Sequence, residues 1–499
     1  MIPPSVGCCK KSEEQQMKDT IVLYPSPGRS HLVSIVELAK LILSHHPSFS
    51  VTIIITDAPF ETGSTASYIA SVSAETPSFT FHHLPTIPIP NTSSSILDIK
   101  TLSFEFHTLI NHHFHDALLS ISQSSNLKAL IMDFFCNYSF EVSTSLGIPT
   151  YYFITGGLTG LAAFLYLPTL HNNFTMSFKE LDEILYIPGI APIPAKNMPV
   201  PMLDRSLKIY KYFLETAIQM TKSAGMIVNA IETLEQKALK AIQNGECTPD
   251  HPAPPIYCVG PLVPTDVSES GGANISKHEC LTWLDSQPSR SVVFLTFGSI
   301  GRFSAKQLKE IAIGLENSGV RFLWVVRAPP PDESEKTTTA AAVEPSLDLL
   351  LPDGFMERTK ERGFVVKGWA PQVEVLNHDS VGGFVTTCGW NSMFESLRAG
   401  VPMLGWTIYA EQNINQLAIV EELKVGLALR KREDGSVSAA ELEKGVIELM
   451  DSESDRGKEL RGQVASMREE LLAALSDGGP SRAALARLAE TIQCNGVIS

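Results

Sequence analysis

The sequence has no apolar run long enough to cross a membrane. Its most apolar stretch, Gly156–Leu167, ends at Pro168 and falls short of the roughly 20 residues that a transmembrane helix needs. The N-terminal residues MIPPSVGCCKKSEEQQMKDT also lack the apolar core of a secretory signal peptide. We therefore expect a cytoplasmic protein without membrane insertion, with a disordered leader over residues 1–17.

Cysteine and clustered metal ligands are scarce. The 499 residues include 8 cysteines, of which only Cys8 and Cys9 are adjacent, and no C-x-x-C spacing occurs. Reduced thiols in a cytosolic protein are the simplest interpretation. One group of histidines lies close together, but the helix expected there offers few carboxylate partners. We therefore predict a polar, partly buried helix face rather than a metal site at His107, His112, His113 and His115.

Basic residues are outnumbered by acidic ones, 39 to 54, which gives a formal net charge of −15. This balance argues against nucleic acid or an anionic membrane as a partner and favours small, apolar or weakly charged ligands. Apolar residues make up 44% of the chain and charged residues 19%, as is typical of a folded globular protein. A chain of 499 residues exceeds what one hydrophobic core usually supports, so we expect two domains.

Short apolar runs alternate with amphipathic stretches through the first half of the chain. Such alternation predicts an α/β domain with a parallel sheet covered on both faces. A helix should follow the Pro-Gly turn at residues 25–28, with Ser30 as its cap. The strands are predicted at residues 20–24, 50–55, 79–83, 129–133, 149–153 and 226–229.

Two polar residues follow strands of this sheet. His31 begins a helix just beyond the first strand, and Asp133 ends the strand ALIMD. Ligands bind at the carboxyl ends of strands in such sheets. A carboxylate beside Phe134 and Phe135 needs a cationic or hydrogen-bonding partner. We therefore predict that His31 and Asp133 pair at one edge of the sheet, rather than serving as a surface histidine and a helix cap.

Other segments are predicted with less detail. Residues 156–170 and the proline-rich residues 187–202 are expected to be loops that build an apolar pocket. A Pro/Gly/Ser-rich passage over residues 251–273 predicts the linker, and residues 328–350 have the composition of a disordered loop. In the second half we predict strands at 291–296 and 321–326, and helices at 304–318, 439–450, 458–475 and 481–492.

The stretch from Trp369 to Gln412 reads WAPQVEVLNHDSVGGFVTTCGWNSMFESLRAGVPMLGWTIYAEQ. Inside it an apolar strand leads through a glycine turn into a helix. The free N–H groups and positive dipole end of such a helix suit a diphosphate. Glu395, one turn into the helix, would face the same ligand and accept hydrogen bonds from a ribose diol.

This stretch resembles the nucleotide-sugar signature box of plant family 1 glycosyltransferases. Further segments are similar to that family's recurring segments, namely PSPGRSHL, IMDFFCN, CLTWLDSQPSRSVVFLTFGSIGRFS and RFLWVVR. The resemblance implies a GT-B fold of two facing Rossmann-like domains with a C-terminal helix that crosses back. It places an acceptor-binding domain at residues 18–255, a UDP-sugar-binding domain at 256–478 and the crossing helix at 479–499.

The resemblance also implies roles for single residues. Trp369 would stack on the uracil, and Gln372 with the backbone near Ala370 would read its edge. Glu395 would bind the ribose. The remaining donor-binding positions are Ser299, Thr387, Gly389, Asn391 and Ser392 at the diphosphate, and Trp390, Glu411 and Gln412 at the sugar.

The implied reaction is inverting, needs no metal or cofactor, and transfers glucose from UDP-glucose to a phenolic hydroxyl of a flavonoid-like metabolite, giving a β-O-glucoside. Glutamine at position 412 indicates glucose. His31 would take the phenolic proton, and Asp133 would orient the imidazole. Thr387 stands where the family usually has a histidine, so a UDP-sugar-binding protein with lost activity stays an alternative, as does C-glucosylation of a polyphenol. A monomer is expected.

Overall fold

The computed structural model describes residues 17–58, 65–88, 96–262, 277–298, 301–330 and 346–494. The predicted leader lies outside these ranges except for Met17, and so do Ser299, residues 263–273 of the predicted linker and residues 331–345 of the loop predicted at 328–350. In the ranges that are described, every helix is too short or too polar to pass through a membrane.

The first half of the chain forms a parallel sheet in the order β3-β2-β1-β4-β5-β8-β9. Successive residues of each strand point to opposite faces: Val22 and Tyr24 of β1 enter one core, whereas Ile21 and Leu23 enter the other. The strands are β1 (Asp19–Tyr24), β2 (Ser50–Ile55), β3 (Phe79–His83), β4 (Asn126–Asp133), β5 (Thr150–Ile154), β8 (Gly225–Val228) and β9 (Ile256–Cys258).

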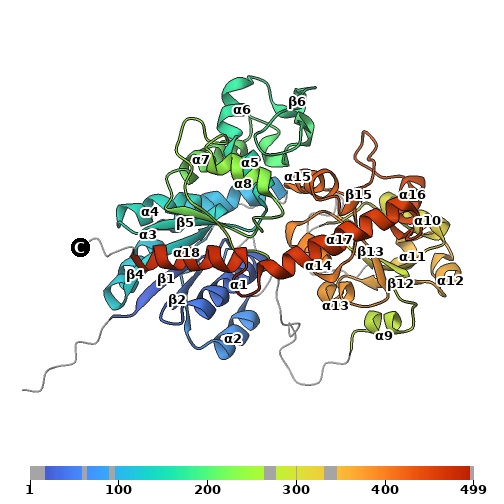
Figure 1. The fold of residues 1–499 in the computed structure, drawn as a ribbon, viewed down its shortest axis with the longest axis horizontal. Helices are drawn as coiled ribbons and strands as arrows, with labels where there is room; N and C mark the ends of the chain where they lie inside the picture. The colour runs from blue at the N-terminus through green and yellow to red at the C-terminus, as the bar shows by residue number, and fades with distance from the viewer. Residues whose placement is uncertain are drawn as a thin grey trace, which may run out of the picture.

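Helices cover both faces of this sheet (Figure 1). They are α1 (Arg29–His45), α2 (Ala66–Glu75), α3 (Ile96–Ser124), α4 (Phe140–Ser145), α5 (Leu158–Leu165), α6 (Leu167–Asn173), α7 (Lys208–Met220) and α8 (Gln236–Gln243), with the 3-10 turn η1 (Phe134–Ser139). β6 (Ile184–Leu185) and β7 (Ile193–Pro194) form a separate antiparallel pair.

The loop predicted over residues 156–170 is wrong, because this segment forms α5 and the first part of α6. Pro168 lies in the first turn of α6, where the missing N–H of proline costs no hydrogen bond. Residues 187–202 do stay largely irregular, with 3-10 turns at Ala195–Asn197 and Val200–Met202.

The second half repeats the architecture in the order β12-β11-β10-β13-β14-β15. Its strands are β10 (Val292–Leu295), β11 (Arg321–Val326), β12 (Gly363–Lys367), β13 (Val381–Thr386), β14 (Met403–Gly405) and β15 (Gly426–Ala428). Its helices are α9 (Glu279–Asp285), α10 (Ala305–Ser318), α11 (Leu347–Leu350), α12 (Phe355–Thr359), α13 (Gln372–Leu376), α14 (Trp390–Ala399), α15 (Gln412–Leu417), α16 (Ala439–Met450), α17 (Asp455–Ala474) and α18 (Pro480–Cys494).

Strand order reverses next to the first strand of each sheet, between β1 and β4 and between β10 and β13. The carboxyl ends of strands at such a reversal form the usual ligand crevice. β9 is a strand that the sequence did not predict, and its pairing with β8 extends the first sheet to Cys258. The predicted domain boundary at residue 255 therefore lies inside this sheet.

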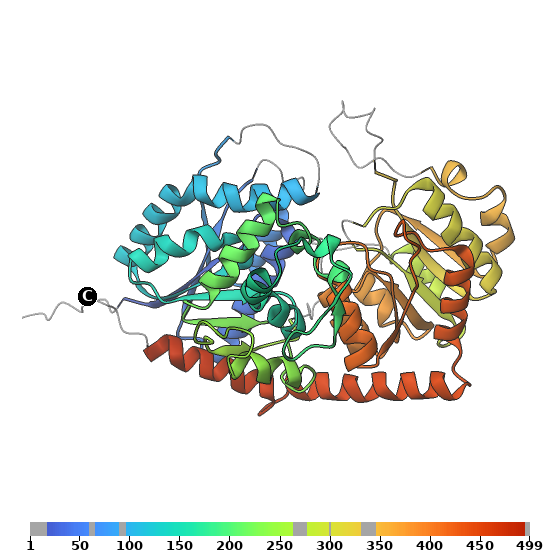
Figure 2. The same cartoon turned by 90° about the horizontal axis from the view of Figure 1, so that it is seen from above.

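The last helix returns to the first domain, as predicted. Figure 2 shows α17 and α18 running in line along one side of the molecule, with α17 beside the second domain and α18 beside the first. The buried face of α18, which contains Leu485, Leu488, Ala489 and Ile492, joins the core formed by β1, β2 and α1. The two domains are thus connected at the linker and again through α18.

We expect Leu488→Ala to destabilise the protein by about 2–5 kcal/mol, because it removes a side chain with no exposed surface from this core. Leu472→Ala on α17 is the control, since Leu472 is 42% exposed. Urea unfolding followed by circular dichroism measures both variants. Equal midpoints for the two would show that α18 is not an integral part of the first domain.

Candidate active site

His31 and Asp133 meet at the reversal point of the first sheet. Gly28, whose φ of 114° suits glycine, precedes α1 and acts as its N-cap, so the cap predicted at Ser30 is wrong and His31 lies in the first turn. The His31 Nδ1 is 2.8 Å from Asp133 Oδ2. The Asp133 side chain is 3% exposed and that of His31 is 29% exposed, so a substrate has access to the imidazole but not to the carboxylate.

Three donors surround the Asp133 carboxylate. Besides His31 at Oδ2, the Ser26 hydroxyl donates to Oδ1 at 2.6 Å and the Phe135 N–H donates at 3.2 Å. Through the Phe135 bond Asp133 also caps η1, a role that the sequence prediction had set aside. Burial by itself raises the pKa of Asp133, but His31, Ser26 and Phe135 outweigh it, and the pKa lies below its ordinary value. Asp133 is therefore ionised near neutral pH and stabilises a protonated His31.

Aromatic rings line the space beside this pair. The Phe135 ring meets the His31 ring edge to face, with centroids 5.8 Å apart. Phe134 contacts Phe135, Phe164 and Phe213 at centroid distances of 5.2, 4.8 and 5.2 Å. Phe164 belongs to α5 and Phe213 to α7, so α5, which replaces a predicted loop, helps to build this aromatic surface.

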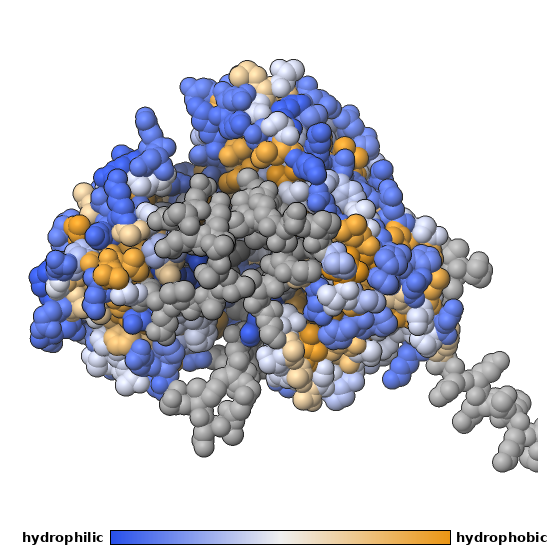
Figure 3. Space-filling model, turned by 180° about the vertical axis from the view of Figure 1, so that it is seen from behind, coloured by the Kyte–Doolittle hydropathy of each residue, from blue (hydrophilic) through white to orange (hydrophobic). Residues whose placement is uncertain are grey.

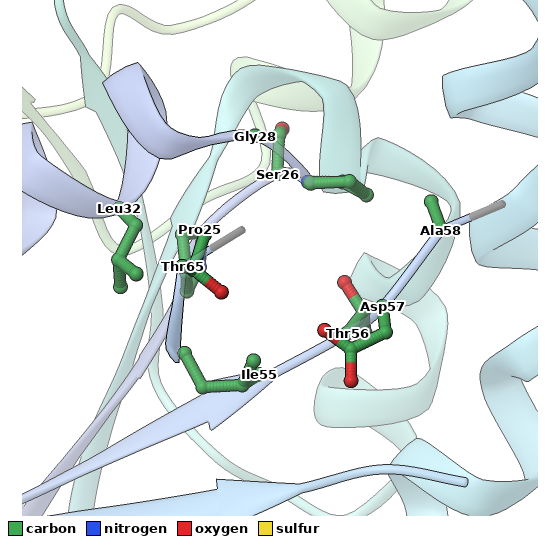
Figure 4. Close-up of a pocket in the computed structure, with 10 residues that line it drawn as sticks. Pro25, Ser26, Gly28, Leu32, Ile55, Thr56, Asp57, Ala58 and Thr65 are labelled. Carbon is green, nitrogen blue, oxygen red and sulfur yellow. The ribbon is translucent and has the colours of Figure 1, made fainter. Parts of the chain in front are cut away.

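A small polar cavity of about 110 Å³ adjoins the pair on its β2 side. Figure 4 shows the Ser26 hydroxyl near one end and the oxygen atoms of Thr56 and Asp57 at the other. Pockets for drug-sized ligands usually measure about 300–1,000 Å³. This cavity is therefore too small to hold a polyphenol by itself.

The predicted diphosphate turn connects β13 to α14. Cys388, and not a glycine, has the left-handed conformation in this turn, with a φ of 64°, which differs from the predicted glycine turn. The Asn415 side-chain amide donates to the Cys388 carbonyl at 2.9 Å, and this bond holds the unusual backbone. Gly389 is the N-cap of α14, so N–H groups of the first helical turn are available to an anion.

Thr387 is the first residue after β13, and it is 5% exposed. A Cβ atom placed on Gly298 would lie 4.0 Å from the Thr387 hydroxyl and 3.8 Å from the Tyr409 hydroxyl. Gly298 follows β10 and has a φ of 70°. The carboxyl ends of β10 and β13, which pair as parallel neighbours, thus lie side by side at the turn.

Gln372 and Glu395, two of the residues predicted to bind uridine, meet beside α14. Gln372 Nε2 donates to Ser392 Oγ at 2.9 Å and to Glu395 Oε2 at 2.5 Å. Trp369 follows β12 and leaves 57% of its surface exposed, as a stacking platform requires, whereas Ala370 is buried.

The residues predicted to bind the sugar differ in how they are held. Glu411 precedes α15 as its N-cap. Gln412 is 3% exposed, and its Oε1 accepts from the N–H groups of Ile408 and Tyr409 at 2.8 and 2.9 Å. These bonds orient the side-chain amide of Gln412. Burial lowers the pKa of Lys100 on α3, and the Glu411 carboxylate opposes this shift. Lys100 of the first domain therefore lies near this end of the site.

The Trp390 side chain belongs to the contact between the domains. Its indole Nε1 donates to the Asn229 carbonyl at 2.7 Å, and the ring is 4% exposed. A Cβ atom on Gly157 would lie 2.3 Å from the ring. The indole is thus enclosed by the first domain, and its predicted contact with the sugar stays a prediction.

Asn229, at the end of β8, is a residue that the sequence analysis missed. Its Nδ2 donates to Asn391 Oδ1 at 3.1 Å, and its Oδ1 accepts from the Leu262 N–H at 2.8 Å. It therefore orients Asn391, which was predicted to hold the diphosphate. Asn229 and Ser26 both follow apolar strands, which is the signal that identified His31 and Asp133.

Among the described residues, no three His, Cys, Asp or Glu side chains are grouped so that they could hold a metal ion. The predicted partly buried helix face is wrong for His107, which is fully buried.

Comparisons with known proteins agree with this geometry. Residues 260–461 match the family described as UDP-glucoronosyl and UDP-glucosyl transferase. UDP-glycosyltransferase 88B1 of Stevia rebaudiana is 48% identical over 94% of this chain and 98% of its own. Anthocyanidin 5,3-O-glucosyltransferase of a Rosa hybrid cultivar is 49% identical over 95% and 98%. The chain belongs to plant family 1 of the UDP-glycosyltransferases.

Solved structures confirm the fold of this glycosyltransferase. Phytolacca americana UGT2, complexed with UDP-2fluoro-glucose and pterostilbene, superposes with a TM-score of 0.81 at 35% identity, covering 95% of this chain and all of that one. The predicted GT-B fold of two facing Rossmann-like domains is therefore confirmed.

The contact between Gly157 and Trp390 can be tested directly in the glycosyltransferase. Gly157→Ala forces a methyl group against the indole, at a cost of about 1–3 kcal/mol, and should weaken UDP binding through displacement of α14. Gly156→Ala is the control, because a Cβ there meets no atom within 4 Å. Calorimetric titration with UDP and thermal melting should separate the two variants. Indistinguishable results would show that the domains tolerate a wider contact here.

Proposed function

We propose that this glycosyltransferase transfers glucose from UDP-glucose to a phenolic hydroxyl with inversion, giving a β-O-glucoside. The observation that carries the proposal is the hydrogen bond between His31 and the buried Asp133, because it supplies a partly exposed base with an ionised carboxylate behind it. The His31 ring presents Nε2 on the side opposite Asp133. This nitrogen takes the phenolic proton as the phenolic oxygen attacks the anomeric carbon.

UDP departure needs stabilisation of the negative charge that develops on the β-phosphate. The N–H groups at the start of α14, the helix dipole, and the side chains of Asn391 and Ser392 supply it. Because neutral hydrogen-bond donors and a helix N-terminus stabilise this charge, the proposed reaction uses no metal and no cofactor. A single displacement at the anomeric carbon inverts its configuration.

Glucose as the donor is supported by Gln412, whose amide is oriented by two backbone N–H groups. It is also supported by the Rosa relative, which is named a glucosyltransferase, and by the Phytolacca structure, which was solved with UDP-2fluoro-glucose.

A planar phenolic acceptor is supported by the aromatic rings around His31, since aromatic pairs favour edge-to-face and offset stacking. The Rosa enzyme is named for an anthocyanidin, and the Phytolacca complex contains pterostilbene. Figure 3 shows apolar side chains gathered at the base of the upper lobe, which carries α6 and β6.

We also propose that the enzyme acts in the cytoplasm as a monomer. The buried cysteines of the described residues are free thiols, which suits a reducing compartment: Cys136, Cys247, Cys258, Cys280 and Cys388.

The function is tested by incubating the full chain with UDP-glucose and a panel of flavonoids while UDP release and product mass are followed. His31→Ala should lower the rate of O-transfer about 10²–10⁴-fold, because the phenol then loses its general base. UDP binding, measured by calorimetry, should stay unchanged and serves as the control for folding.

Three outcomes would change the assignment. Near-normal rates in His31→Ala would remove this residue from the mechanism. UDP binding without turnover on any acceptor would favour a binding protein with lost activity. A product whose sugar resists acid hydrolysis would indicate C-glucosylation.

The role of position 387 gives a separate prediction. A neutral hydroxyl contributes about 0.5–1.5 kcal/mol through a hydrogen bond, against about 1.5–3 kcal/mol when a charged partner takes part. Thr387→His should therefore lower the KM for UDP-glucose or raise kcat. Thr387→Val, which removes the hydroxyl at nearly constant volume, should do the opposite. An unchanged donor dependence in both variants would show that the diphosphate is held without this side chain.

A further inference from the structure

A fully buried histidine lies behind the catalytic pair. His107 is 0% exposed, and its Nδ1 is 2.6 Å from the carbonyl oxygen of Ser103, one turn earlier in α3. A carbonyl can only accept a hydrogen bond, so Nδ1 carries the proton. Burial lowers the pKa of His107 to about 4. The ring is therefore neutral near pH 7, and its Nε2 is an acceptor.

The Cys136 thiol connects His107 to the active site. Its Sγ lies 3.2 Å from His107 Nε2 and 3.4 Å from the Tyr24 carbonyl oxygen. Burial raises the pKa of the Cys136 thiol, so the thiol keeps its proton and donates it to one of these two acceptors. The sulfur is also 3.8 Å from Ser26 Oγ. Cys136 thus packs against the hydroxyl that binds Asp133.

Ser26 connects Cys136 to Asp133. It is 3% exposed and lies between the Cys136 sulfur and Asp133 Oδ1. A hydroxyl has one proton, and a carboxylate is a much stronger acceptor than sulfur. The Ser26 proton therefore points to Asp133.

We propose that Ser26, Cys136 and His107 form a positioning network that holds the Asp133 carboxylate in place and limits its attraction for the His31 proton. The proposal rests on the proposed function of His31 as the general base. A donor at Oδ1 withdraws charge from the carboxylate, so Oδ2 binds the imidazolium less strongly. Without that donor, His31 keeps its proton to higher pH, and less of the enzyme has a free base.

The neighbouring titratable groups allow this effect to be measured. Burial raises the pKa of Tyr24 on β1, Tyr152 on β5 and Cys136 on η1, and it lowers that of His107 to about 4. None of these four groups changes charge between about pH 5 and pH 8. A shift in the acid limb of the rate profile therefore reports the pair itself.

The test compares Ser26→Ala with the wild-type enzyme at saturating UDP-glucose between pH 5 and pH 8. We expect kcat for a phenol to fall roughly 10-fold and the acid limb to move up by about 0.5–1 pH unit. The KM for UDP-glucose should not change. Cys136→Ala and His107→Phe should shift the acid limb in the same direction by a smaller amount. Cys136→Ser keeps a hydrogen-bond donor at this position, so its acid limb should match that of the wild-type enzyme.

Ser143→Ala is the matched control, because it also removes a fully buried hydroxyl from the first domain, one that lies against Phe140 and Thr150. A second readout does not depend on turnover: NMR titration of ¹⁵N-labelled histidines, with the His31 signal assigned by its loss in His31→Gln. If the wild type transfers no glucose, the proposed function fails, and this titration alone decides the inference. The inference would be overturned if the His31 titration or the acid limb of Ser26→Ala matched that of Ser143→Ala.

Discussion

Burying the Asp133 carboxylate at the end of β4 requires that donors from the protein replace water. These donors come from three separate segments: His31 from the start of α1, Ser26 from the turn after β1, and the Phe135 N–H from η1. The carboxylate thereby fixes the relative positions of all three. The orientation of the base and the position of the aromatic surface that begins at Phe135 both result from the hydrogen bonds that compensate the burial of this carboxylate.

The donor half of the site depends on the first domain as well. Trp390 and Asn391 open α14, and both bind Asn229 at the end of β8. The helix end that suits the diphosphate is therefore held by the domain that carries the base. α18 adds a second connection, because its apolar face completes the core beside α1. These contacts keep the base and the donor turn in a defined relation, which a single displacement requires.

Agreement between sequence and structure follows the strength of the local signal. The strands predicted with explicit bounds agree with observed strands to within about three residues at each end, because burial on both faces makes most of them continuously hydrophobic. The short strand β9 was missed, since a strand of three residues gives no periodicity. Residues 156–170 were predicted as a loop because glycines and Pro168 suggested one, yet their apolar side chains are buried as α5 and α6. The local sequence of this segment does not indicate which other segments pack against it.

The sequence by itself determined two α/β domains, the pairing of His31 with Asp133 and a helix start with Glu395 one turn in, because each rests on polar residues at strand ends or at helical spacing. Only the tertiary structure decided that the Trp390 indole faces Asn229, that Cys388 has the left-handed backbone, and that His107 and Cys136 lie behind the base. Those features depend on contacts between segments far apart in the chain. Such contacts are set by packing and burial, which no local pattern of residues records.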